Sequence, residues 1–76
     1  MLVNVRIIGN LPYMVKGLQR RYDDLPLEEG ARLAELLFKI GIKHKLLAFA
    51  DGKRIEECMP LTEGMEITLV SPAAGG

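Results

Sequence analysis

Residues 31–40 read Ala-Arg-Leu-Ala-Glu-Leu-Leu-Phe-Lys-Ile, and this stretch decides the fold. Its aliphatic residues recur with the i, i+3, i+4, i+7 spacing of one helix face, at Leu33, Leu36, Leu37 and Ile40. Gly41 follows directly and suits the left-handed residue that often ends a helix. The sequence therefore predicts one amphipathic helix over 31–40, whose apolar face must be buried against another layer of structure.

The charges around this helix agree with its direction. Glu28 and Glu29 precede it, where the helix dipole favours negative charge, and Lys39 lies near its end, where the dipole favours positive charge. Gly30 is the expected N-cap, although glycine is only a fair capping residue. The helix is thus expected to start directly after Gly30.

Strand-like segments surround the helix. Two precede it, at 2–8 and 18–25, and three follow it, at 45–50, from 53 to 56 and at 66–70. β-Branched and aliphatic residues dominate the first and last of these segments, as is typical of strands. This order of elements predicts an α+β domain, with a mixed sheet of four to five strands packed on one main helix.

Two local signals refine the sheet. Asp51-Gly52, between the third and fourth segments, is a strong signal for a hairpin turn. The 18–25 segment is mostly polar, which an edge strand tolerates. The sequence therefore predicts a hairpin near its middle and an edge strand before the helix.

The first and last strands are expected to share an outward face. Side chains alternate across a strand, so Thr68 and Val70 turn away from the helix, and Arg6 and Ile8 do so on the first strand. If the two strands are neighbours, Ile8 and Val70 form an exposed apolar patch of the kind that often marks an interface. Ordinary exposure of apolar side chains is the alternative interpretation.

Composition limits the classes of function. The 76 residues suffice for one domain, expected over 1–71, followed by a flexible tail at 72–76. Ten basic and ten acidic residues cancel, whereas nucleic-acid binding needs a basic excess. Cys58 is the single cysteine, and it is interpreted as a small apolar residue rather than a persulfide acceptor, so no thiol-based metal site is expected.

The expected compartment is the cytoplasm. No apolar run approaches the roughly 20 residues that span a bilayer. The first residues, 1–6, lack the basic and then apolar pattern of a signal peptide. We therefore expect neither a membrane nor a nucleic acid as partner.

The last five residues read Pro72-Ala73-Ala74-Gly75-Gly76 and have almost no side chain to bury. A frayed terminus is one interpretation. The other is a thin peptide that enters a narrow channel of a partner, because glycine lets another backbone approach closely. Two terminal glycines place an unhindered carboxylate at the tip, and Pro72, Ala73 and Ala74 would contact the partner.

The segment 60–76, Pro-Leu-Thr-Glu-Gly-Met-Glu-Ile-Thr-Leu-Val-Ser-Pro-Ala-Ala-Gly-Gly, is similar to the C-terminus of the MoaD/ThiS family of ubiquitin-like sulfur-carrier proteins. Residues 28–37 resemble the start of that family's helix, except that Arg32 stands where members often have Thr or Ser. The resemblance extends over the whole chain in order and length. It implies the β-grasp fold.

The resemblance also implies a function. A ubiquitin-activating-type adenylyltransferase would use ATP to adenylate Gly76, next to Gly75, and sulfur would then replace AMP to give a thiocarboxylate. The carrier itself would be no enzyme and would bind no cofactor or metal. Its second partner would be a molybdopterin synthase large subunit or a thiazole synthase.

Three destinations for the sulfur remain open: molybdopterin or its tungsten equivalent, the thiamine thiazole, and another pathway. The chain length favours the molybdopterin type, but residues 9–14 lack the Phe-Ala…Arg-Glu character common in that branch. A ubiquitin-like modifier conjugated through Gly76 is a different class of function, and a pure binding module is a third.

Overall fold

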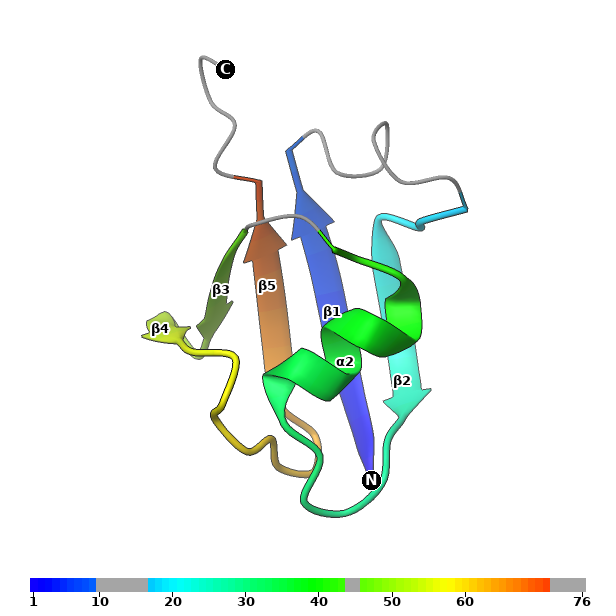
Figure 1. Ribbon diagram of the computed structural model, residues 1–76, viewed down its shortest axis with the longest axis vertical. Helices are drawn as coiled ribbons and strands as arrows, with labels where there is room; N and C mark the ends of the chain where they lie inside the picture. Colours follow the sequence, from blue (N-terminus) through cyan, green and yellow to red (C-terminus); the bar gives the residue numbers. More distant parts are fainter. Residues whose placement is uncertain (10–16, 44–45, 72–76) are drawn as a thin grey trace.

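The computed structural model describes residues 1–9, 17–43 and 46–71, and within them one helix packs on one face of a five-stranded sheet (Figure 1). The elements in chain order are β1 (Leu2–Ile8), β2 (Arg21–Pro26), α2 (Leu33–Ile40), β3 (Leu47–Ala50), β4 (Lys53–Ile55) and β5 (Glu66–Val70). The predicted α+β class and the predicted order of elements are therefore confirmed.

The strands lie in the order β2-β1-β5-β3-β4, which makes the sheet mixed. β1 and β5 run parallel at its centre, whereas the β1–β2, β3–β5 and β3–β4 pairs are antiparallel. The last strand of the chain is thus the middle strand of the sheet. This arrangement is compatible with a β-grasp-like fold.

The core lies between α2 and the inner face of the sheet. Val3, Val5 and Ile7 of β1 alternate with outward-facing neighbours and are at most 3% exposed. The remaining members of the core come from the helix, the other strands and the connections, namely Leu18, Leu33, Leu36, Leu37, Ile42, Ala48, Ala50, Ile55, Leu61, Ile67 and Leu69. Burial of these residues, roughly 25 cal/mol per Å² of apolar surface, drives the folding of so short a chain.

The helix begins two residues later than expected, because its N-cap is Arg32 and the prediction of Gly30 was wrong. Gly30 lies instead in a turn, where its φ is +82° and where the Ala31 amide donates to the Glu28 carbonyl. The side chain of Glu35 accepts a 3.2 Å hydrogen bond from the Arg32 amide. This bond caps the start of the helix without help from the Arg32 side chain.

The end of the helix follows the prediction. Gly41 has a φ of +85°, and its amide donates to the Phe38 carbonyl. The next amide, that of Ile42, donates to the Leu37 carbonyl at 2.9 Å. This pair of bonds is the Schellman pattern, which satisfies carbonyls that have no partner within the helix.

The predicted hairpin turn is also confirmed. Asp51 and Gly52 both have positive φ, +52° and +79°, as the tightest two-residue hairpins require. β3 begins at Leu47, later than the predicted 45–50. β4 returns over Lys53–Ile55 and forms one edge of the sheet.

The other edge strand, β2, is the polar segment expected there, but it runs from Arg21 to Pro26 rather than over 18–25. A change of register opposite Asn4 interrupts its pairing with β1, and Asp24 there has a φ of +53°. The Asp24 amide donates to Asn4 Oδ1 at 2.9 Å, and Asn4 Nδ2 donates to Glu66 Oε2 at 2.7 Å. The Asn4 side chain therefore ties β2 to β5 across β1.

In the described part of the chain, no helix combines the length and the apolar character needed to cross a bilayer.

Candidate functional site

The centre of the sheet determines where the last residues of the chain begin. β5 runs parallel to β1, so the carboxyl ends of both strands lie at the same edge of the sheet (Figure 1). Val70, the last residue of β5, lies opposite Ile8, the last residue of β1. The Ser71 amide then donates to the Ile8 carbonyl at 3.3 Å. The predicted site residues Pro72, Ala73, Ala74, Gly75 and Gly76 lie outside the described residues, so their roles stay predictions.

At this edge the residues that follow β1 and β5 lie close together. Gly9 directly follows β1 and has a φ of +99°. A Cβ atom built on Gly9 would lie 3.1 Å from the Cβ of Ser71, which is tighter than ordinary van der Waals contact. Glycine is therefore favoured at position 9, both by its backbone conformation and by its neighbour.

The outward face predicted for β1 and β5 is present. Arg6 lies opposite Thr68 and Ile8 lies opposite Val70, and these residues alternate with the buried positions of the two strands. Ile8 is 46% exposed, as expected. Val70 is only half-buried rather than exposed, because Ile8 flanks it on one side and Leu47 of β3 flanks it on the other.

Two residues of β3 enlarge this apolar area, and the sequence reasoning missed them. Leu47 lies opposite Val70, and Phe49 lies opposite Thr68, next to it on the same face. Both are half-buried and alternate with the buried Ala48 and Ala50. The signal was available in the large-small alternation of Leu-Ala-Phe-Ala over 47–50.

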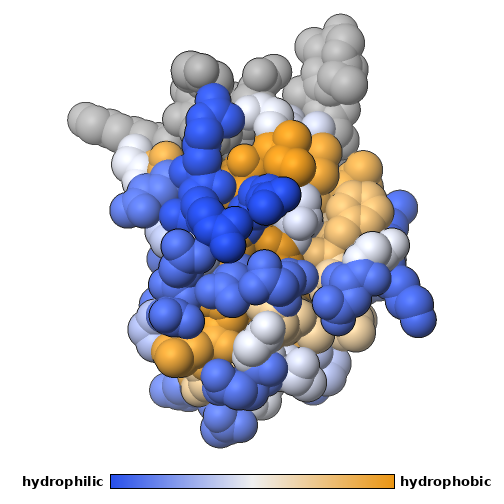
Figure 2. All heavy atoms as spheres, turned by 180° about the vertical axis from the view of Figure 1, so that it is seen from behind, coloured by the Kyte–Doolittle hydropathy of each residue, from blue (hydrophilic) through white to orange (hydrophobic). Residues whose placement is uncertain are grey.

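We call the set Ile8, Leu47, Phe49 and Val70 the outer-face patch. Figure 2 shows the face of the molecule away from the helix, where hydrophobic atoms gather in its upper part and hydrophilic atoms adjoin them. The patch spans three neighbouring strands and lies at the edge of the sheet where β1 and β5 end. It is continuous with the point from which residues 72–76 begin.

Basic side chains border this patch. Across the sheet, one row of paired residues runs from Arg21 to Arg6, then through Thr68 and Phe49 to Arg54. Arg21 forms a 2.8 Å ion pair with Asp23, whereas no acidic residue lies within the row itself. The face therefore combines an apolar centre with positive charge, which suits a partner surface that places carboxylates around an apolar contact.

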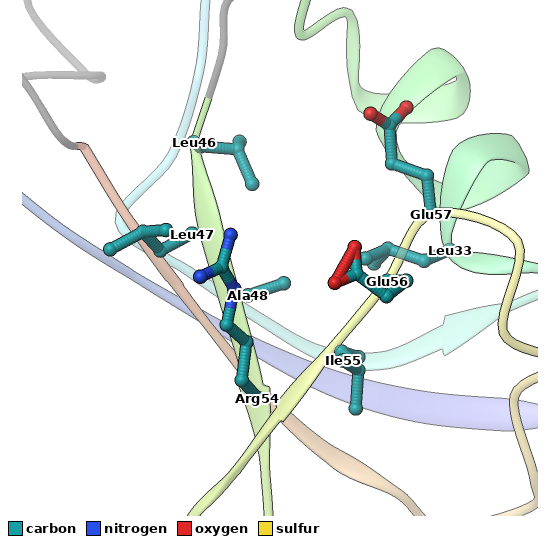
Figure 3. Close-up of a pocket in the computed structure, with 8 residues that line it drawn as sticks. All are labelled: Leu33, Leu46, Leu47, Ala48, Arg54, Ile55, Glu56 and Glu57. Atoms are coloured by element: carbon teal, nitrogen blue, oxygen red, sulfur yellow. The ribbon is translucent and has the colours of Figure 1, made fainter.

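A hollow of about 330 Å³ lies at the β4 edge of the sheet, between the start of α2 and the β3–β4 hairpin (Figure 3). Two of its lining residues, Leu47 and Arg54, also belong to the outer face described above. Its lining comes from Leu33, Leu46, Leu47, Ala48, Arg54, Ile55, Glu56 and Glu57. Leu33, Ala48 and Ile55 are buried and form its floor, while the charged residues are exposed at its rim. Apolar and charged groups therefore share its lining, and it is not a dry apolar pocket.

Chemistry-bearing side chains are sparse in the described ranges. Within residues 1–9, 17–43 and 46–71, no group of three or more His, Cys, Asp and Glu side chains is placed to hold a metal ion. Cys58 is a free, exposed thiol in the connection after β4. It is exposed and therefore does not belong to the core.

The fold and the site thus define a small α+β domain whose middle strand leads into the last residues of the chain, beside an apolar sheet face. Comparisons with protein-family models, with curated proteins and with solved structures each gave no match.

Proposed function

We propose that this protein is a sulfur carrier of the MoaD/ThiS type with a β-grasp fold, and that it carries its sulfur as a thiocarboxylate on Gly76. The sequence resemblance raises this proposal, and one structural observation supports it most directly. β5, the strand that precedes the Gly-Gly end, is the central strand of the sheet and ends at Val70 beside Ile8.

That position suits a carrier because it separates two tasks. The rigid sheet offers the outer-face patch to a partner, and residues 72–76 lead from the rim of that patch toward the partner's active site. Five residues span at most about 18 Å, at roughly 3.3–3.6 Å each. A partner docked on the sheet face would therefore receive Gly76 within that distance of the contact.

The chemistry requires an activating enzyme. A free carboxylate is a poor electrophile, so the activating enzyme first joins the Gly76 carboxylate to the α-phosphate of ATP and releases pyrophosphate. Sulfide then attacks the acyl-adenylate, displaces AMP and leaves the thiocarboxylate. If a persulfide is the donor, its terminal sulfur displaces AMP to give an acyl disulfide, and a second thiol of the donor enzyme must cleave the S–S bond to release the thiocarboxylate. In this mechanism the carrier contributes only the carboxyl carbon of Gly76 and supplies no acid or base. The activating enzyme holds the ATP.

The first destination that we propose is molybdopterin, or its tungsten equivalent, with this chain as the small subunit of the synthase. The alternative carrier role delivers sulfur to the thiamine thiazole. A ubiquitin-like modifier would use the same activation but would end in an isopeptide bond between Gly76 and a lysine of another protein. Intact mass, sulfur delivery and peptide digests distinguish these three outcomes.

The deciding experiment mixes the full chain with candidate activating enzymes and ATP. We expect release of pyrophosphate and a chain heavier by one AMP group, and then, after sulfide is added, a chain heavier by the oxygen-to-sulfur difference. A chain that lacks Gly75 and Gly76 is the control and should release no pyrophosphate.

Two results would contradict the proposal. One is a chain that stays a plain carboxylic acid with every activating enzyme of its host. The other is a mature native protein that continues beyond Gly76, which intact mass spectrometry of the protein from its host would detect.

A further inference from the structure

The outer face of the sheet consists of rows that differ in chemical character. Residues paired across neighbouring strands share a face, so the strand pairing defines each row. The row at the carboxyl ends of β1 and β5 is apolar and consists of Ile8, Val70 and Leu47. The next row is basic. In the third row Asn4 lies opposite Glu66 and beside Asp24, so this row carries carboxylates.

The basic row consists of Arg21, Arg6, Thr68, Phe49 and Arg54. Asp23 pairs with Arg21 at 2.8 Å. Arg6 and Arg54 are exposed, and neither forms an ion pair with a residue that the structure describes. These two guanidinium groups are therefore open to carboxylates of a partner.

The charge of Arg6 also opposes the stability of the fold. Arg6 lies directly opposite Arg21 on β2, and like charges that face each other across an antiparallel pair are destabilising. The core does not need this side chain, because Arg6 is exposed between the buried Val5 and Ile7. A charge that costs stability on an exposed face is typical of a residue that serves binding.

We propose that Arg6 and Arg54 select the activating enzyme by pairing with two carboxylates of its docking surface, on either side of an apolar contact with the outer-face patch. Arg6 on β1 and Arg54 on β4 are separated by three strand spacings, about 14 Å at roughly 4.8 Å each. The two carboxylates need a similar separation. This inference rests on the proposed function and names the chemistry of the surface that recognises the carrier.

The third row determines the orientation of the enzyme on the sheet. If the enzyme were rotated by half a turn in the plane of the face, its apolar contact would cover Asn4 and Glu66. Burying the Glu66 carboxylate under an apolar group costs free energy, because the carboxylate loses its water. The apolar contact of the enzyme therefore lies over the row at the carboxyl ends of β1 and β5.

The test measures charge-reversed variants in the pyrophosphate assay, with the activating enzyme that adenylates the original chain. Arg6→Glu and Arg54→Glu should each raise the KM for the carrier about three- to tenfold, because a partner carboxylate then meets a like charge. We expect kcat to stay within about twofold, since the chemistry at Gly76 is unchanged. The difference in KM should shrink as the salt concentration rises.

Lys53→Glu is the matched control for Arg54→Glu. It makes the same change of net charge on the same strand, but Lys53 pairs with the buried Ala50 and belongs to the other face of the sheet. Its KM should stay within about twofold of the original. An equal rise in KM for Lys53→Glu would overturn the inference, because net charge rather than the basic row would then set the affinity.

Urea unfolding separates a role in binding from a role in the fold. The midpoint of Arg6→Glu should equal or exceed that of the original chain, because glutamate faces Arg21 with the opposite charge. A lower midpoint would make Arg6 a structural residue and overturn its assignment to docking.

Two further outcomes distinguish this inference from the proposed function. If the original chain is adenylated and both Arg6→Glu and Arg54→Glu keep its KM, the inference is wrong and the proposed function stands. If no activating enzyme of its host adenylates the original chain, the proposed function is contradicted and the inference falls with it.

Discussion

Ile8 lies directly opposite Val70 on the parallel central strands, and both end at the same edge of the sheet. The Ile8 carbonyl also accepts a hydrogen bond from the Ser71 amide, so the pairing continues one residue beyond β5. This pairing holds Ser71 beside the end of β1, at the rim of the outer-face patch.

Gly9→Ala should destabilise this pairing. The backbone of alanine would have to keep a φ of +99°, and its Cβ would lie 3.1 Å from the Cβ of Ser71. We expect a loss of about 2–3 kcal/mol in the free energy of unfolding, measured by urea titration, because the backbone strain alone is worth about 1–2 kcal/mol.

Gly30→Ala is the matched control for that variant. Gly30 has a φ of +82°, but a Cβ there would meet nothing within 4 Å. It should therefore lose only the backbone contribution, about 1–2 kcal/mol. Equal losses at the two positions would mean that the contact with Ser71 has no energetic weight.

Ile8→Thr should weaken the proposed partner contact and leave the fold intact. Threonine keeps the β-branched shape that suits a strand but replaces apolar surface that is 46% exposed. We expect about fivefold or greater loss in affinity for the activating enzyme, measured by isothermal titration. Leu2→Thr is the control, since Leu2 is 42% exposed at the other end of β1 and should bind normally.

Much of this fold follows from local patterns in the sequence. The spacing of Leu33, Leu36 and Leu37 determines which helix face is buried, whatever lies opposite, so the helix, its buried face and its end at Ile40 were predicted correctly, although its start was not. The alternation in β1 and β5 is equally local, because each apolar residue that faces the core is followed by one that does not. The turn at 51–52 needs positive φ, for which Asp-Gly is suited.

The errors arise where distant residues decide the outcome. α2 begins after Arg32 because the Leu33 and Ala34 amides donate to the Met59 and Glu57 carbonyls, which local propensity cannot reveal. The limits of β2 depend on the register with β1. Leu47 and Phe49 were missed as surface residues because the sequence does not show which strands lie beside β3. The order of the strands in the sheet does.

Asn4→Ala should loosen the edge strand β2. The Asn4 side chain accepts from the Asp24 amide and donates to Glu66, so alanine removes both hydrogen bonds. We expect a loss of about 1–2 kcal/mol in the free energy of unfolding, at roughly 1 kcal/mol for each partly exposed bond. Hydrogen exchange should speed up at the Asp24 amide, while the amides of β3 and β4 should change only by the global loss of stability.

Glu66→Gln separates the two bonds of Asn4. It keeps the side-chain oxygen that accepts from Asn4 Nδ2 and leaves the bond to the Asp24 amide untouched. We expect a stability change below about 0.5 kcal/mol. If Glu66→Gln were as damaging as Asn4→Ala, the negative charge rather than the bridging amide would hold β2 in place.

Deletion of Gly75 and Gly76 should abolish sulfur loading without destabilising the domain. Every buried core residue in the described part of the chain lies between Val3 and Leu69, so the folded body keeps its contacts. We expect a melting temperature within about 2 °C of the original, which corresponds to less than about 0.5 kcal/mol for a chain of this size. Loading should cease because the new terminal carboxylate ends at Ala74, about 7 Å short of the original tip.

Loading is read by intact mass after incubation with the activating enzyme, ATP and sulfide, beside Ala74→Ser as a control that keeps the length. A shortened chain that still loads would remove Gly76 from the mechanism, and a large drop in melting temperature would assign the two glycines to the fold instead.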